Sequence, residues 1–122
     1  MHELSVCLSL MQQVENIVRE HNAIRVTRIV LDVGPLSGVE SELLHNAYPI
    51  AAAGTPAEKA ELVIETAAVV VRCSQCDSES TVRPNKLLCG ACGDFRTRVI
   101  AGDELTLLRV ELDHEIGPAN PA

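Results

Sequence analysis

Two cysteine pairs carry the clearest chemical signal in this 122-residue sequence. Cys73 and Cys76 form one CxxC pair, Cys89 and Cys92 form a second, and twelve residues, 77–88, lie between the pairs. Each CxxC turn can supply two thiolates, and two such turns complete the tetrahedron of soft ligands that Zn(II) prefers. Because cysteine fills every ligand position, we expect a structural zinc rather than a catalytic one. The alternatives are an iron site in the same tetrahedron and a redox dithiol pair, but neither explains why there are two pairs.

The amino-terminal tripeptide Met1-His2-Glu3 is a second candidate metal site. A free amine on Met1, the backbone nitrogen of His2 and the His2 imidazole can chelate one ion through adjacent rings. Such a flattened, nitrogen-rich set suits Ni(II) or Cu(II) better than Zn(II). Glu3 could add a backbone nitrogen or a carboxylate oxygen. The alternative is that His2 is merely solvated and that Glu3 favours a helix start through its charge. The residues alone leave both interpretations open.

Composition narrows the class of protein. A net charge of −7 and a pI near 5.0 argue against a nucleic-acid groove. Tyr48 and Phe95 are the only aromatic residues, so the core must be aliphatic and a base-stacking platform is missing. Four of the five cysteines lie in CxxC pairs, which suits metal binding in a reducing compartment. No apolar run approaches the ~20 residues that span a bilayer, and the start lacks a signal peptide. We therefore expect a cytoplasmic protein with no membrane contact.

The metal sites must be positioned by helices and strands that the apolar pattern indicates. Helical spacing of apolar residues predicts an amphipathic helix over about residues 4–21. Ser37-Gly38-Val39-Glu40 has the form of a capping box and predicts the start of a second helix. Pro49 lies inside that helix and should kink or divide it. Strands are predicted by β-branched and alternating apolar residues over 25–33, 62–72 and 105–112.

This order of elements predicts an α+β fold, a two-layer unit with two helices on a three-stranded mixed sheet. A four-cysteine zinc ribbon is inserted between the last two strands. We expect residues 1–70 and 104–114 to form the α/β domain that binds nickel, and residues 71–103 to form the inserted zinc-binding domain. Residues 115–122 have nothing to bury, so a disordered tail is expected.

The chain resembles the HypA/HybF family of hydrogenase-maturation nickel metallochaperones. The resemblance rests on the combination and order of four stretches, and it extends from Met1 to about Leu112. These stretches are the opening Met-His-Glu-Leu-Ser, the segment Val-Gly-Pro-Leu-Ser-Gly-Val-Glu at 33–40, the two CxxC pairs, and Ala-Gly-Asp-Glu-Leu-Thr-Leu-Leu at 101–108. No single stretch is specific by itself. The chain departs from the usual family pattern at Pro49, which puts the geometry of the second helix in doubt.

The resemblance implies a nickel chaperone without catalytic activity of its own. His2 matches the family's essential nickel ligand, Glu3 its neighbour, and the four cysteines its zinc ligands. Such a protein passes nickel, with a partner GTPase, to the large subunit of a [NiFe] hydrogenase. Family members also serve urease in some organisms, which adds urease maturation proteins to the implied partners.

The residues leave an alternative function and several alternative residue roles open. The rival function is a structural zinc-ribbon adaptor that mediates protein contacts and carries no nickel; a second metal ion beside zinc would distinguish the two. Glu40 could reach the nickel end as an outer carboxylate, although pairing with Ser37 in the capping box explains it without metal.

Cys7 lies on the apolar stripe of the first helix and should be core. The remaining histidines are His21, expected to interact with carbonyls at the helix end, and His45 and His114, expected to be solvated.

Overall fold

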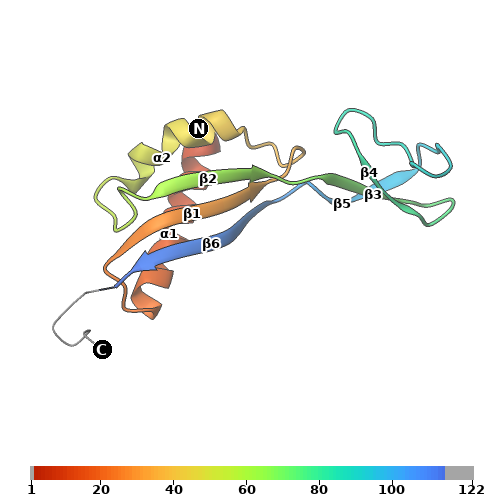
Figure 1. The fold of residues 1–122 in the computed structure, drawn as a ribbon. Coiled ribbons are helices and arrows are strands. Elements are labelled where there is room, and N and C mark those ends of the chain that lie inside the picture. The colour runs from red at the N-terminus through yellow and green to blue at the C-terminus, as the bar shows by residue number, and fades with distance from the viewer. Residues whose placement is uncertain (1, 115–122) are drawn as a thin grey trace. The chain divides into compact units, whose positions relative to one another are not determined.

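The computed structural model describes residues 2–114, except the side chain of His2 (Figure 1). The predicted tail, 115–122, lies outside the described residues, and so does Met1. Within that range the chain forms two helices and six strands. In chain order they are α1 (His2–Glu20), β1 (Arg25–Val33), α2 (Ser41–Ala52), β2 (Glu61–Thr66), β3 (Val69–Cys73), β4 (Glu79–Val82), β5 (Thr97–Ala101) and β6 (Leu105–Asp113).

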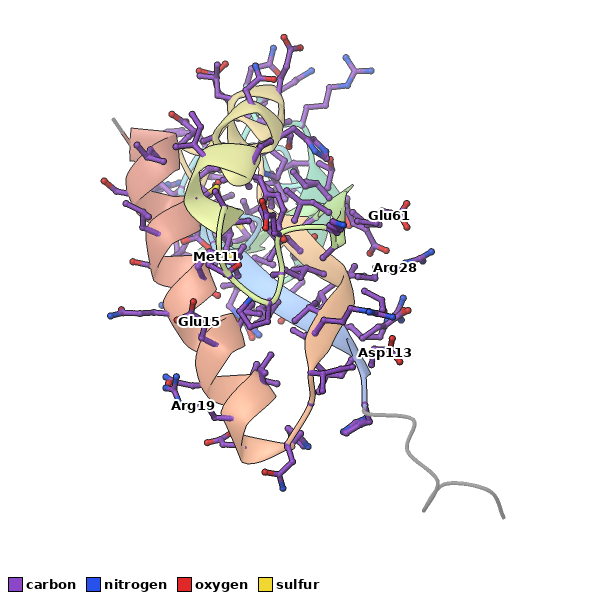
Figure 2. The ribbon with its side chains drawn as sticks, turned by 90° about the vertical axis from the view of Figure 1, so that its left-hand side faces the viewer. Met11, Glu15, Arg19, Arg28, Glu61 and Asp113 are labelled. Atoms are coloured by element: carbon purple, nitrogen blue, oxygen red, sulfur yellow. The ribbon has the colours of Figure 1, made fainter. Side chains whose placement is uncertain are left out.

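The first sheet has the order β2-β1-β6, with β1 in the centre. The arrows of β1 and β2 point the same way and that of β6 points the opposite way, so the sheet is mixed (Figure 1). Both helices lie on one face of this sheet (Figure 2). Parallel neighbours need a crossover connection, and α2 lies within the one that joins β1 to β2. The predicted two-layer arrangement of two helices on a three-stranded mixed sheet is confirmed.

The core between helices and sheet is aliphatic, as the composition predicts. The residues that α1, β1 and α2 bury most completely include Cys7, Val14, Ile29, Leu31 and Leu44. On β1 the alternation of side chains also leaves a polar position, where the Arg28 guanidinium lies 3.1 Å from the Glu61 carboxylate on β2 (Figure 2). Apolar burial is the main contribution to stability here, because ion pairs between exposed side chains contribute little.

The strand predicted over 62–72 was wrong as a single element. It consists of β2 and β3, which belong to different sheets and are separated at Ala67 and Ala68. A second sheet, in the order β4-β3-β5, was not predicted at all. The apolar pattern runs through the break because Val and Ile continue on both sides of it. A change of sheet alters the hydrogen-bonding partners without altering the residue types.

Two glycines make the close backbone contact beside this break. A Cβ atom at Gly34 would lie 2.2 Å from the carbonyl oxygen of Gly102. A Cβ atom at Gly102, where φ is +98°, would lie 2.8 Å from the carbonyl oxygen of Ala68. Atoms at these separations overlap, so both positions require glycine. The contact is held by hydrogen bonds of 2.9 Å from Gly34 N to the Glu104 carbonyl and from Leu36 N to the Gly102 carbonyl.

The predicted capping box at the start of α2 was wrong. The N-cap is Glu40, which has extended backbone angles and no side-chain cap. Ser37 instead accepts a hydrogen bond from Val39 N at 3.2 Å, which closes a local turn. Gly38, with φ of +80°, turns the chain between Ser37 and the helix. The serine is therefore three residues before the N-cap rather than at it.

Helix α2 continues through Pro49 and ends at Ala52, so the proline does not divide it. Pro49 is exposed and lies in the last turn, where its missing N–H affects only the His45 carbonyl four residues earlier. The chain then turns at Gly54, whose φ of +78° matches the left-handed conformation common just after a helix.

The contacts divide the chain into two compact units. Among the described residues, the helical unit contains those up to Val30, Glu40–Val63 and those from Leu107 to His114. The cysteine unit contains Leu31–Val39 and Ile64–Thr106. Separate folding of the predicted zinc-binding domain, residues 71–103, stays a prediction.

Candidate metal centres

The four cysteines lie at the ends of two loops in the cysteine unit. Cys73 is the last residue of β3, whose burial alternates so that Val69, Val71 and Cys73 are all buried. Strand β3 is the central strand of its sheet and pairs antiparallel with both β4 and β5. The first cysteine therefore comes from the best-supported strand of this sheet.

Both CxxC loops have the same backbone hydrogen bonds. In the first, Asp77 N donates to the Cys73 carbonyl at 3.0 Å, and Cys73 N donates to the Ser78 carbonyl at 2.9 Å. In the second, Gly93 N donates to the Cys89 carbonyl and Cys89 N donates to the Asp94 carbonyl, both at 2.9 Å. The fifth residue of each loop has a positive φ, +62° at Asp77 and +76° at Gly93.

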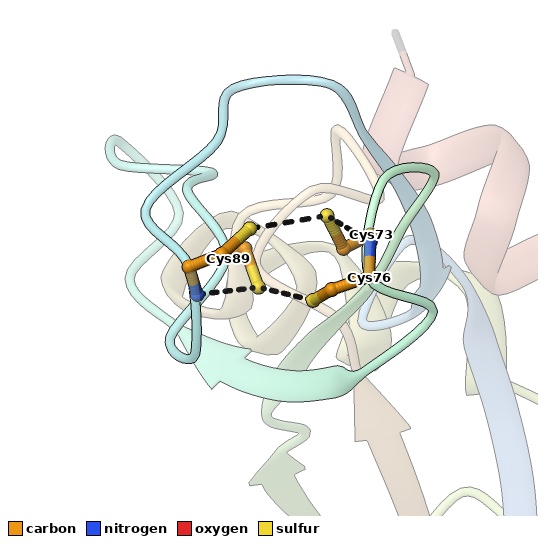
Figure 3. Close-up of side chains that lie close together, drawn as sticks. Cys73, Cys76 and Cys89 are labelled. Atoms are coloured by element: carbon orange, nitrogen blue, oxygen red, sulfur yellow. Dashed lines mark hydrogen bonds between the residues drawn. The ribbon is translucent and has the colours of Figure 1, made fainter.

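The sulfur atoms converge at a separation that fits zinc. All four lie within 4.8 Å of one another, and Figure 3 shows Cys73, Cys76 and Cys89 converging from the two loops. The Cys73 and Cys92 sulfurs are 3.7 Å apart, and those of Cys76 and Cys89 are 3.5 Å apart. A regular tetrahedron with Zn–S bonds of ~2.3 Å has sulfurs ~3.8 Å apart. The cluster therefore fits a tetrahedral metal, as the spacing predicts, and its donor set is consistent with zinc.

Backbone N–H groups donate hydrogen bonds to the sulfur of the first cysteine in each pair. The Cys73 sulfur accepts from Gln75 N at 3.3 Å and from Cys76 N at 3.4 Å. The Cys89 sulfur accepts from Ala91 N and Cys92 N, both at 3.3 Å. The donors on Cys92 and Ala91 lower the pKa of the Cys89 thiol from 9.0 to about 6. Deprotonated sulfur is the form that binds the metal.

The second cysteine in each pair faces solvent. Cys76 and Cys92 are exposed, whereas Cys73 and Cys89 are buried. Hydrogen bonds from Ser78, first through its side chain and then through its backbone, lower the pKa of the Cys76 thiol. With four cysteine sulfurs converging on one point, a metal bound there would have no ligand position left for a substrate. The arrangement suits a metal that holds the loops together.

A further set of contacts links the two loops, and the sequence analysis missed it. Arg96 donates from Nε and Nη2 to the two carboxylate oxygens of Asp94, at 2.9 and 2.8 Å. These hydrogen bonds from Arg96 lower the pKa of Asp94 to about 2. The Arg96 carbonyl accepts from Ser74 N at 2.9 Å and from Ser74 Oγ at 2.8 Å, which ties the second loop to the first. An Asp-x-Arg triplet beside a cysteine is the only sequence signal for it.

Of the predicted nickel ligands, the structure describes only the side chain of Glu3. Helix α1 begins at His2, but Met1 and the His2 side chain lie outside the described residues. Glu3 is described: its Oε2 accepts a hydrogen bond from Glu40 N at 3.3 Å. The Glu40 side chain is exposed, and its role towards nickel stays a prediction.

The other residues considered in the sequence take structural positions. Cys7 is fully buried, and its thiol donates to the Leu44 carbonyl with an S···O separation of 3.6 Å. Burial, and then the charge of Glu3, raises the pKa of the Cys7 thiol. His45 is exposed, as predicted. His114 is also exposed, but its Nε2 lies 3.0 Å from the His21 carbonyl, a contact that the sequence did not predict.

Comparisons of the sequence with known proteins all point to one family of metal-binding proteins. The family model described as hydrogenase/urease nickel incorporation, metallochaperone, HypA, matches residues 1–112. The hydrogenase maturation factor HypA of Nitrosospira multiformis is 49% identical over 112 residues, covering 92% of this chain and 97% of that protein. HypA of Aquifex aeolicus is 41% identical over 113 residues, covering 93% and 98%.

Solved structures give the same fold. The chain matches a solution structure of a HypA protein with a TM-score of 0.74 and 25% identity, covering 94% of this chain and 98% of the other. It matches the solution structure of the Ni metallochaperone HypA from Helicobacter pylori with a TM-score of 0.71 and 23% identity, covering 93% and 98%. In the part of the chain that is described, neither helix is long and apolar enough to cross a membrane. By sequence along nearly its whole length, the chain belongs to the HypA family of nickel-incorporation metallochaperones.

Proposed function

We propose that this protein binds Ni(II) at the amino end of α1 and delivers it during maturation of [NiFe] hydrogenase, with a structural Zn(II) in the four cysteines. The observation that carries the proposal is the family match over residues 1–112, which includes both the opening tripeptide and the cysteine pairs. The proposed partners are a hydrogenase-maturation GTPase and the hydrogenase large subunit. Urease maturation proteins are a further class of proposed partner, since they would also receive nickel. The protein is not an enzyme, because it binds and transfers a metal ion and catalyses no reaction.

We propose His2 as the principal nickel ligand, with the Met1 amine and Glu3 completing the set. The backbone supports this choice because the first four N–H groups of an α-helix have no partner within the helix. In α1 these groups include the backbone N–H groups of His2 and Glu3. Nitrogens of His2 and Glu3 can therefore bind a metal without breaking a helical hydrogen bond. The helix dipole disfavours a cation at this end, and the negative charge of a deprotonated amide nitrogen offsets that effect.

The two metals differ in how readily they leave. The zinc shell has four thiolates, and the second sheet has little apolar core of its own, so the metal supplies folding free energy there. The proposed nickel shell lies at the first turn of a helix and is built from nitrogen ligands that protons can displace. A carrier needs this difference, because the cargo must depart while the scaffold remains folded.

The test is a nickel titration of zinc-loaded protein. We expect one nickel equivalent beyond the zinc, and we expect His2→Ala to abolish it without changing the zinc content. His45→Ala is the matched control, because His45 is an exposed histidine on α2. Residues added ahead of Met1 should also abolish binding by removing the amine.

Two outcomes would contradict the proposal. If wild-type protein takes up no nickel beyond zinc, the chain acts as a zinc-ribbon adaptor rather than a carrier. If His2→Ala binds nickel as tightly as His45→Ala does, the site lies elsewhere in the chain. Normal binding by the extended protein would exclude the amine alone and leave His2 as a ligand.

A further inference from the structure

We propose that Glu3 is a positioning residue, whose carboxylate caps α2 and thereby holds the first turn of α1 in place for nickel. This inference rests on the proposed function, since it concerns the same end of α1. Its starting point is the hydrogen bond from Glu40 N to Glu3 Oε2, at 3.3 Å. Glu40 is the N-cap of α2, so the bond joins the amino ends of the two helices.

Helix α2 needs this contact because it has no cap of its own. Its N-cap, Glu40, makes no side-chain cap hydrogen bond. In a capping box the third helical residue is Glu or Gln, and its side chain accepts from the N-cap backbone N–H. In α2 that position is Leu43, which has no acceptor. Glu3 supplies the missing acceptor from the other helix.

A second contact one turn further along repeats the pattern. Cys7 is four residues after Glu3, and its thiol donates to the carbonyl of Leu44, four residues after Glu40. Residues four apart lie on one face of a helix. The two contacts therefore form successive rungs between α1 and the start of α2. Both rungs involve the backbone of α2, so side-chain substitutions on α2 leave them in place.

A mostly apolar groove lies beside Glu3, between α1 and α2. The groove has a volume of about 200 Å³, and Glu3 and Leu4 line it together with Leu43, Ala47 and Ile50 of α2. The Glu3 side chain therefore forms part of the groove wall, and its carboxylate accepts from Glu40 N at the start of α2. The side chain is thus directed towards α2.

The arrangement assigns the two parts of Glu3 to different tasks. The carboxylate is committed to Glu40 N, so the backbone nitrogen remains as the ligand that Glu3 can offer to nickel. Holding the first turn of α1 before metal arrives reduces the ordering cost of binding. Loss of the acceptor should therefore weaken nickel binding even though no ligand is removed.

The test compares two substitutions at one position in the zinc-loaded, full-length protein. Glu3→Gln keeps a side-chain oxygen that can accept from Glu40 N, whereas Glu3→Ala removes it. We expect Glu3→Ala to speed amide exchange at Glu40 and to weaken nickel binding, each by roughly fivefold, the effect of one ordinary hydrogen bond. Glu3→Gln should stay within about twofold of wild type in both measurements, because a neutral acceptor serves the cap. Glu42→Ala is the matched control for charge, since Glu42 is an exposed acid in the first turn of α2.

The outcomes separate this inference from the proposed function. If Glu3→Gln loses as much nickel affinity as Glu3→Ala, or if nickel itself frees the Glu40 amide, the carboxylate acts by charge or as a ligand and the positioning role is wrong. If Glu3→Ala leaves Glu40 exchange unchanged in the absence of nickel, the cap does not exist. A wild-type protein that binds no nickel would overturn the proposed function instead, while the effect of Glu3→Ala on the Glu40 amide would still report on the cap.

Discussion

At the scale of the residue, the zinc site depends on one turn position in each loop besides the four ligands. The fifth residue of each CxxC loop adopts a positive φ, and it is Asp77 in the first loop and Gly93 in the second. Glycine and aspartate are among the residue types that tolerate this conformation. Each loop can therefore return its chain while the first sulfur faces two backbone donors. The metal-binding motif therefore includes the turn residue of each loop as well as its two cysteines.

Tyr48 offers a pH-dependent prediction. Its hydroxyl donates to the Ala57 carbonyl at 2.7 Å, and burial, followed by the charge of Cys7, raises its pKa from 10.0 to about 12. A raised pKa in the folded state means that this stabilisation is complete below pH ~10 and is lost as the pH rises through ~12. We expect the tyrosinate absorbance to rise only near pH 12, or together with unfolding.

The measurement is clean because the chain has one tyrosine and no tryptophan. Tyr48→Phe should remove the alkaline absorbance change. It should also lower the free energy of unfolding by about 1–3 kcal/mol, because the Ala57 carbonyl loses its donor in a buried setting. Ionisation near pH 10 in protein that stays folded would show that the hydroxyl is open to solvent.

The convergence of the four cysteines could be predicted from residue types and spacing alone, because two CxxC pairs in one short segment are typical of a metal site. The roles of Asp77 and of the Asp94–Arg96 pair could not. Asp77 matters through its backbone angle, and Arg96 matters largely through its carbonyl, which accepts from Ser74. Neither property follows from the residue type. Glu3 shows the same limit, since its partner is a backbone N–H 37 residues away.

At the scale of the element, we expect the second sheet to depend on a metal bound by the four cysteines. Cys73→Ala or Cys92→Ala should each lose the zinc equivalent and unfold the sheet of β3, β4 and β5, while α1 and α2 keep their helical signal. Four coupled thiolates contribute on the order of 10 kcal/mol to folding in small zinc modules. Metal analysis and circular dichroism measure the two effects. Cys7→Ala is the matched control, because Cys7 is a cysteine of the helical core and should keep the zinc.

Helix α2 carries a cost that a single substitution should remove. Pro49→Ala restores the N–H that the His45 carbonyl lacks, and it does so at an exposed position. We expect the free energy of unfolding to rise by about 1–2 kcal/mol. This figure allows for the loss of the restriction that proline places on the unfolded chain, which partly offsets the gain. Chemical denaturation measures it. His45→Ala, one turn earlier on the same exposed face, should change stability by less than about 0.5 kcal/mol.

The main elements could be predicted because each has a long apolar period, as α1 and β1 do. Strands β4 and β5 could not, because they have four and five residues and alternate only between intermediate and exposed positions. Their stability comes from pairing with β3 and from the metal rather than from their own sequence. The start of α2 was misplaced for a related reason. Its cap comes from α1, which a local motif cannot reveal.

At the scale of the whole molecule, the two metals should respond differently to acid. Protons compete for the imidazole, and for any amine or amide ligand, so nickel affinity should fall as the pH drops from neutral. The zinc site should persist to lower pH, because four coupled ligands and the folding of the second sheet oppose release. Titration of doubly loaded protein, with each metal followed separately, measures the order. Zinc leaving first, or both metals leaving together, would contradict the prediction.

The central position of β1 has a consequence for biosynthesis. Its neighbour β6 lies near the end of the described chain, so the β2-β1-β6 sheet cannot be completed until Leu105–Asp113 has left the ribosome. All four cysteines emerge earlier, and the loop between the two pairs is short, which makes it inexpensive in entropy to close. We therefore expect zinc to be taken up cotranslationally, before the helices have a finished sheet to pack on. In a cell starved of zinc, the nascent chain would keep its aliphatic surfaces exposed for longer. Chaperones would then bind it, or proteases degrade it, before it could bind nickel.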